Sequence, residues 1–273
     1  YTADYEKSAA NLTRLIESYK NAIESKKYDG RKLNGAKILL SSLYYARGFV
    51  YYSQKKEKES ADDLKMAMEG IRKTFSLYYK CNILLSRINS ANPENEEKYI
   101  HSALSNYLPR WKIQDVNDTA EKLLSYYEKI GFDYENHGKY NSAADIYFKS
   151  ISLISYLYQR GKFNDLYDKY APRAHVLYID AKSADKTSSK SALSDLEKDY
   201  LKNLNIARMD FDKAYIYALA YVYSKKALGD SSDSVKSNPE IFAENFKKAI
   251  EQTDWALFMD DTFSDAYLLK GWI

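Results

Sequence analysis

The sequence is poor in the residues that interrupt helices and shows no pattern typical of β-strands. Its 273 residues include only 9 glycines and 4 prolines, and no Asn-Gly or Asp-Gly turn joins two runs that alternate with a period of two. So few glycines leave little material for the loops that bind phosphates or dinucleotides. A turn-rich β protein and a nucleotide-binding loop enzyme are therefore both disfavoured, and an all-α chain is expected.

Cysteine and long apolar runs are also almost absent. Cys81 is the only cysteine, so an internal disulfide is impossible, and its apolar neighbours predict a buried, unreactive thiol. The uncharged stretch of residues 214–224 is about half as long as the roughly 20 residues that a membrane-spanning helix needs. We therefore expect no membrane-spanning segment in this chain.

Neither sign of charge dominates the sequence. The chain has 41 Lys and Arg against 38 Asp and Glu, and the signs interleave, as in Lys55-Lys56-Glu57-Lys58-Glu59. A nucleic-acid partner would require a sustained basic surface. Nucleic acid is therefore disfavoured as a partner.

Residues that could perform catalysis or bind metal are scattered. His101, His137 and His175 lie far apart with no second ligand at metal spacing, which favours surface or helix-end positions over zinc binding. The acidic pairs Asp62-Asp63 and Asp260-Asp261 are expected to be solvated, the first on a charged helix face and the second in a turn. No nucleophile elbow or phosphate-binding loop is present. We expect no catalytic residue, no metal and no cofactor, and hence no enzyme.

Helical periodicity, in contrast, extends over almost the whole chain. Apolar residues at helical spacing predict a first helix over about residues 4–25. They are Leu12, Leu15, Ile16, Tyr19 and Ile23. Breaks at residues 29–30, 89–93, 108–109, 137–138, 160–161, 182–190 and 229–239 leave helices of about 15 to 30 residues. Residues 184–194 and 231–234 are interpreted as insertions between helices, so a single domain over residues 1–273 is predicted.

Two helix starts share one signal. Asn92-Pro93-Glu94 and Asn238-Pro239-Glu240 both combine a capping side chain, a proline suited to the first helical position and an acidic residue for the positive helix end. Each is predicted to begin a helix.

One stretch carries small and aromatic residues at a characteristic spacing. It comprises Tyr127, Ile130, Gly131, Tyr134, Gly138, Tyr140, Ala143, Tyr147 and Ser150. Counted from Gly131, aromatic residues lie four before, three after and sixteen after, and small residues lie twelve and nineteen after. This spacing resembles the tetratricopeptide repeat. The resemblance implies that the small residues let two antiparallel helices approach closely while the tyrosines fill the volume between pairs.

Two less regular copies accompany it. One comprises Tyr44, Gly48, Tyr51, Ser60, Leu64 and Ala67, and a C-terminal one comprises Ala249, Thr253, Ala256, Leu257, Ala266, Tyr267 and Gly271. The resemblance implies an all-α, right-handed α-α superhelix of about five to six antiparallel helix pairs, with long helices and an irregular repeat length. The repeat length is irregular because Gly48 and Gly131 are 83 residues apart, which is not a multiple of the family's period of about 34. A plain helical bundle is the alternative.

In this family the first helix of each pair lines a concave groove, so the resemblance also assigns candidate binding residues. The copy at Gly48 offers Ser42, Tyr45, Phe49, Tyr52 and Ser53, the copy at Gly131 offers Ser125, Glu128, Phe132, Glu135 and Asn136, and the C-terminal end offers Leu268 and Trp272. We call Tyr45, Phe49 and Tyr52 the aromatic wall. Beside an acidic segment, it would suit a peptide with apolar anchors and a Lys or Arg.

Two functions fit these features. The first is a non-catalytic scaffold that binds a protein or peptide on its concave face. The second is an exported periplasmic or lipid-anchored protein that closes around a small apolar solute or lipid. Low cysteine content together with richness in Tyr, Ser and Asn favours such a location, and the cytoplasm is the alternative. The start at Tyr1 and the apolar end at Trp272 lead us to expect a natural chain that continues beyond both ends, or another chain that covers the C-terminal end.

Overall fold

The structure is a computed structural model that describes residues 2–73, 75–108, 116–160, 163–184, 189–206, 212–228 and 239–273. Within these residues every regular element is an α-helix, and there are twelve of them. The all-α fold class is therefore confirmed. The contacts divide the chain into two compact units, Tyr1–Leu123 and Leu124–Ile273, which are described separately below. The single domain over residues 1–273 stays a prediction.

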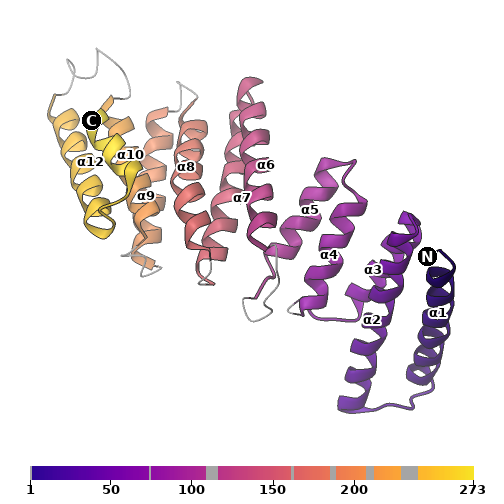
Figure 1. The fold of residues 1–273 in the computed structure, drawn as a ribbon. Helices are drawn as coiled ribbons and strands as arrows, with labels where there is room; N and C mark the ends of the chain where they lie inside the picture. Colours follow the sequence, from indigo (N-terminus) through magenta and orange to yellow (C-terminus); the bar gives the residue numbers. More distant parts are fainter. Residues whose placement is uncertain are drawn as a thin grey trace. The chain divides into compact units, whose positions relative to one another are not determined.

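The first unit is a series of helices joined by short turns. They are α1 (Thr2–Glu24), α2 (Gly30–Ser53), α3 (Glu57–Glu69), α4 (Ser76–Ile88), α5 (Pro93–Leu104) and the start of α6 (Val116–Asn136). Each of α1 to α4 packs against the next helix along the chain. Figure 1 shows neighbouring helices in alternating directions, as short connections require.

The predicted boundaries are partly right. The first helix matches α1 closely, and Asn92 caps α5 by accepting a hydrogen bond from the amide of Asn95. The breaks after Ser53 and after Glu69 were not predicted, so the 13-residue helices α3 and α4 are shorter than expected. The predicted breaks at residues 108–109, 160–161, 182–190 and 229–239 lie wholly or partly outside the described residues, as do the insertion at 231–234 and the cap Asn238.

The less regular copy of the repeat forms the interface between α2 and α3. A β-carbon on Gly48 would lie only 3.2 Å from Cγ of Leu64 and 3.2 Å from the Ser60 carbonyl oxygen. The Ser60 hydroxyl donates to the Gly48 carbonyl at 2.7 Å. Ser60, Leu64 and Ala67 are all fully buried. The small and large residues of this copy therefore set a close helix approach, as the resemblance implies.

A buried ion pair reinforces this unit. Arg47 of α2 donates from Nε and Nη2 to the two carboxylate oxygens of Asp63 in α3, each at 2.7 Å, and from Nη1 to Thr13 of α1 at 2.9 Å. The pair raises the pKa of Arg47, chiefly through its hydrogen bond to Asp63. The expectation that Asp63 is solvated on a charged face is therefore wrong, because its side chain is almost entirely buried against α2.

The second unit contains the remainder of α6 and six further helices. They are α7 (Tyr140–Tyr158), α8 (Asn164–Ser183), α9 (Ser189–Ile206), α10 (Lys213–Leu228), α12 (Pro239–Met259) and α13 (Ser264–Trp272). In addition to contacts between successive helices, α8 packs directly against α10. This alternate packing is typical of a series of stacked helix pairs.

The most regular copy of the repeat joins α6 to α7. A β-carbon on Gly131 would lie 2.3 Å from Cε1 of Tyr147, so any larger residue would have to displace the Tyr147 ring or move the two helices apart. Tyr127, Ala143 and Tyr147 are buried as well. The packing at Gly131 and Gly48 confirms the resemblance to divergent tetratricopeptide-like helix pairs.

The sequence analysis also predicted the environments of Cys81 and His175. Cys81 is fully buried, and burial raises its pKa to about 12, which agrees with a thiol that is seldom ionised. His175 was expected at a surface or a helix end, but it lies in the middle of α8 and is 1% exposed. That expectation is wrong, because α9 and α10 supply aromatic rings that enclose the imidazole.

Candidate functional site

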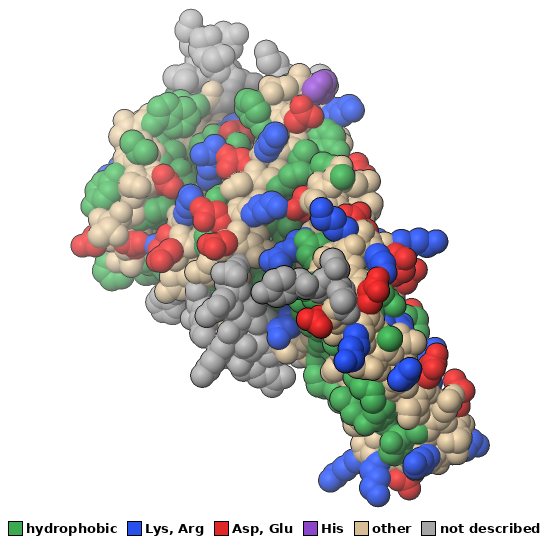
Figure 2. Space-filling model, turned by 45° about the vertical axis from the view of Figure 1, so that its right-hand side comes forward, with side chains coloured by type: hydrophobic (Ala, Val, Ile, Leu, Met, Phe, Trp, Pro, Cys, Tyr) green, Lys and Arg blue, Asp and Glu red, His purple; other side chains and the backbone are tan. Residues whose placement is uncertain are grey.

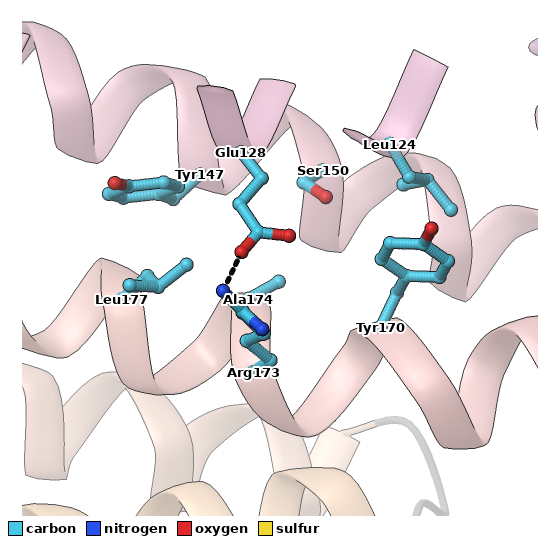
Figure 3. Close-up of a pocket in the computed structure, with 8 residues that line it drawn as sticks. All are labelled: Leu124, Glu128, Tyr147, Ser150, Tyr170, Arg173, Ala174 and Leu177. Atoms are coloured by element: carbon cyan, nitrogen blue, oxygen red, sulfur yellow. Dashed lines mark ion pairs between the residues drawn. The ribbon is translucent and has the colours of Figure 1, made fainter. Parts of the chain in front are cut away.

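The helices α6, α7 and α8 form a shallow hollow on the second unit (Figure 3). Its enclosed space is only about 10 Å³, which is room for a single water molecule. The lining side chains are Leu124, Glu128, Tyr147, Ser150, Tyr170, Arg173, Ala174 and Leu177. We call this surface the α6–α8 hollow. A solute could not be enclosed here, whereas a chain laid across the surface could contact it.

Predicted site residues of α6 reach across this hollow to α8. Glu128 forms an ion pair with Arg173, which Figure 3 marks as a dashed line. The hydroxyls of Ser125 and Tyr170 lie 2.9 Å apart. The charge of Glu128 is thus matched by a cation, and Arg173 is the more open partner, with 66% of its side chain exposed against 27% for Glu128.

The other predicted residues of α6 follow along the same helix. Phe132 is 59% exposed, a large apolar area for a single side chain in water. Asn136 is exposed at the end of the helix. Glu135 is partly buried, and burial raises its pKa. No ion pair to Glu135 occurs among the described residues of the chain.

The aromatic wall of the first unit is divided between core and surface. Tyr45 and Tyr52 pack against the core cluster that contains Leu64, Cys81 and Leu85. Burial is the main cause of the raised pKa of Tyr45. Phe49, between them on α2, is 48% exposed. The wall therefore presents one open ring, supported by two tyrosines that are partly buried.

The C-terminal candidates lie on an exposed face of α13. Trp272 is 59% exposed and Leu268 is exposed to a still greater extent. On the neighbouring α12, the rings of Trp255 and Phe258 stack with centroids 5.5 Å apart. The apolar character predicted for this end of the chain is thus present on its surface.

Sequence reasoning missed the ion pairs that join α8 to α10. Asp180 accepts hydrogen bonds from Tyr221 at 3.0 Å and from Lys225 at 2.6 Å. Lys213 contacts both Asp168 and Asp260, so Asp260 is also paired rather than merely solvated. Nothing in the local sequence signals these pairs, because their members are more than 40 residues apart.

Charges of both signs also interleave in space. On the face shown in Figure 2, the Lys and Arg side chains alternate with Asp and Glu, and apolar groups lie between them. Among the described residues, no three His, Cys, Asp or Glu side chains gather in a way that could hold a metal ion. No described helix is long and apolar enough to cross a membrane.

Comparison with known proteins gives matches among solved structures. No protein-family model matches the chain, and no curated protein matches it. A TPR repeats protein from Bacteroides fragilis is 14% identical with a TM-score of 0.41, covering 100% of this chain and 99% of its own. The C-terminal part of a TPR repeat-containing protein from Cytophaga hutchinsonii is 16% identical with a TM-score of 0.23, covering 98% and 99%. Both are proteins to which this chain is similar.

Proposed function

We propose that this protein is a non-catalytic binding protein that holds a protein or peptide segment across the α6–α8 hollow. The observation that carries the proposal is the open ring of Phe132, which follows Glu128 by one helical turn on α6, together with the shallow hollow that Glu128 and Arg173 line. Interfaces of this kind depend on a few aromatic or arginine anchors surrounded by polar groups. A hollow too small for a solute favours an extended partner over an enclosed one.

The charges around the hollow indicate the chemistry of the segment. Glu128 already pairs with Arg173, whereas Glu135 has no ion pair among the described residues. Burial raises the pKa of the Glu135 carboxylate. A Lys or Arg of the partner would stabilise the ionised form of this carboxylate, which favours binding of a cation there. We therefore expect a segment with an apolar anchor at Phe132 and a cation about one helical turn away at Glu135.

Selection from a phage-displayed library of random peptides tests this function. Peptides that bind should share an apolar residue and a Lys or Arg, and their affinity should fall at least about tenfold on Phe132→Ala and on Glu135→Gln. Ile241→Ala on α12 is the matched control, because Ile241 is 54% exposed but lies on a different helix. Equal loss with the control, or no loss with either variant, would remove the hollow as the binding site.

The other functional expectations remain proposals. The aromatic wall, with Tyr45, Phe49 and Tyr52, would form a separate binding surface on the first unit, and Trp272 would contribute one at the C-terminal end of the second. The alternative function is an exported protein that binds a small apolar solute, and one specific observation favours its solute-binding part, namely the cavity at His175 described below. Binding of peptide and binding of solute are separate measurements, so either can fail alone.

A further inference from the structure

A second, larger cavity lies in the second unit at the meeting point of α7, α8, α9 and α10. Its volume is about 190 Å³. Its lining side chains are Phe148, Ile151, His175, Tyr178, Leu196, Asp199, Tyr200, Asn203 and Tyr215. We call this space the His175 cavity. None of its residues belongs to the α6–α8 hollow.

The His175 cavity is apolar and aromatic inside and polar at its edge. Ile151, Leu196 and Tyr200 are almost fully buried, whereas Asp199 and Asn203 are exposed. At the edge, the rings of Phe148 and Tyr178 lie with their centroids 5.8 Å apart. An apolar interior with a few polar groups is the usual composition of a small-molecule site.

One buried polar atom in this cavity lacks a partner. His175 is 1% exposed, and its Nε2 atom is buried without a hydrogen bond among the described residues. The other ring nitrogen, Nδ1, lies 2.7 Å from the Tyr200 hydroxyl. Burial lowers the pKa of His175 to about 3, so the imidazole is neutral at physiological pH and carries one proton.

The Tyr200 hydroxyl determines which nitrogen carries that proton. Tyr200 is buried, and its contact with Nδ1 is the only hydrogen bond that the described residues offer it. A buried hydroxyl proton needs an acceptor, so Tyr200 donates and Nδ1 accepts. The imidazole proton is then on Nε2, which is left as a buried, unpaired donor of a residue that lines the cavity, an arrangement that is unfavourable until an acceptor reaches it.

We propose that the His175 cavity binds a small, neutral, mostly apolar molecule that places one acceptor oxygen on Nε2 of His175. A cavity of about 190 Å³ is slightly larger than the engineered one of about 150 Å³ that takes benzene, so a single substituted ring is the appropriate size. The acidic Asp199 at the edge disfavours an anion. The rings of Tyr200 and Tyr215, which contact His175 at centroid distances of 5.5 and 4.6 Å, would enclose the ligand's apolar part.

Two probes of nearly the same shape test the assignment. Acetophenone carries a carbonyl oxygen where α-methylstyrene carries a methylene group, and only the carbonyl can accept from Nε2–H. Calorimetric titration of the purified protein should give an affinity for acetophenone at least about tenfold higher than for α-methylstyrene, since an unpaired buried donor is satisfied only by the first. Equal affinities, or no binding of either probe at millimolar concentration, would overturn the proposal.

The double variant His175→Phe/Tyr200→Phe provides the matched control. It removes both members of the hydrogen bond, so neither is left buried without a partner, and it retains two rings of similar size. We expect this variant to bind both probes equally, with the preference for acetophenone lost. A preference that persists would show that the oxygen is recognised elsewhere.

A measurement on the unmodified protein keeps the test independent of how the variant folds. The chain has 3 histidines, so ¹⁵N-labelled histidine gives a readable spectrum. The Nε2 resonance of His175 should shift on addition of acetophenone, while those of His101 and His137 stay unchanged. An unchanged His175 resonance at saturating acetophenone would mean that the ketone oxygen does not reach Nε2, and the proposal would be wrong. Peptide binding at the α6–α8 hollow is unaffected by this result.

Discussion

Gly131 of α6 lies directly against the ring of Tyr147 in α7, with room for a hydrogen and none for a methyl group. A β-carbon at this position would lie 2.3 Å from Cε1 of the tyrosine, and the ring is 1% exposed, so it has nowhere to move. Two residues at the spacing of the sequence motif are therefore in direct contact between the paired helices.

We predict that Gly131→Ala destabilises the protein by about 1–3 kcal/mol, because the added carbon forces α6 and α7 apart. Urea unfolding followed by circular dichroism measures the change. Gly271→Ala is the control, because nothing lies within 4 Å of a β-carbon at that position. Comparable destabilisation by both substitutions would contradict the packing described here.

The ion pair between Arg47 and Asp63 should stabilise the first unit, as the packing of Gly131 on Tyr147 stabilises the second. Both side chains are largely buried, and removal of one member leaves the other charge uncompensated. Arg47→Met is therefore expected to cost about 3–5 kcal/mol. Lys247→Ala breaks the exposed pair with Glu251 and should cost less than about 1 kcal/mol. The double variant Arg47→Met/Asp63→Leu should recover much of the loss, and equal costs for the buried and exposed pairs would refute this reasoning.

The turn between α2 and α3 shows why one helix boundary escaped prediction. The amides of Lys55 and Lys56 donate to the carbonyls of Tyr52 and Tyr51, and Lys55 adopts a positive φ of 59°. Gly138 occupies the equivalent place after α6, with a φ of 68° and the same pair of hydrogen bonds. A glycine at this place in a sequence predicts such a helix end, whereas a lysine does not.

This equivalence leads to a prediction for Lys55. Lys55→Gly should stabilise the protein by up to about 1 kcal/mol, because glycine adopts a positive φ without the steric cost that lysine carries. Lys65→Gly, at an exposed position within α3, should instead destabilise it by about 1 kcal/mol. Thermal unfolding of the two variants gives the comparison, and a loss of stability in Lys55→Gly would contradict the assignment of the turn.

The sequence was most informative where packing follows a fixed spacing. Gly48, Gly131 and Tyr147 were identified because close helix approach requires small and large residues at regular intervals along one chain. Asp63 and His175 were misplaced because their burial depends on distant partners, Arg47 in the first case and Tyr200 and Tyr215 in the second. Periodicity indicates which face of a helix is buried, but it does not show which polar group on that face will find a partner.

The buried imidazole of His175 predicts a particular pH dependence of stability. Its folded pKa of about 3 lies below the ordinary value of 6.5, so between these values the unfolded chain binds a proton that the folded chain does not. Stability is therefore full above pH 6.5 and falls as the pH drops towards 3. Between pH 7 and pH 5 this loss should be about 2 kcal/mol.

Urea midpoints at the two pH values measure this loss. The loss should be much smaller in His175→Phe/Tyr200→Phe, while His137→Gln, which alters an exposed histidine, should keep the wild-type dependence. Identical pH dependence in all three proteins would mean that His175 titrates normally in the folded state.

Hydrogen–deuterium exchange with a selected peptide locates the binding surface on the protein. Exchange of the backbone amides should slow in α6 and α8 when the peptide is bound, because the segment lies across Glu128, Phe132 and Arg173. Protection should be absent from α12, which carries the control residue Ile241. Protection confined to α12, or unchanged exchange in α6 and α8 at saturating peptide, would contradict the proposed site.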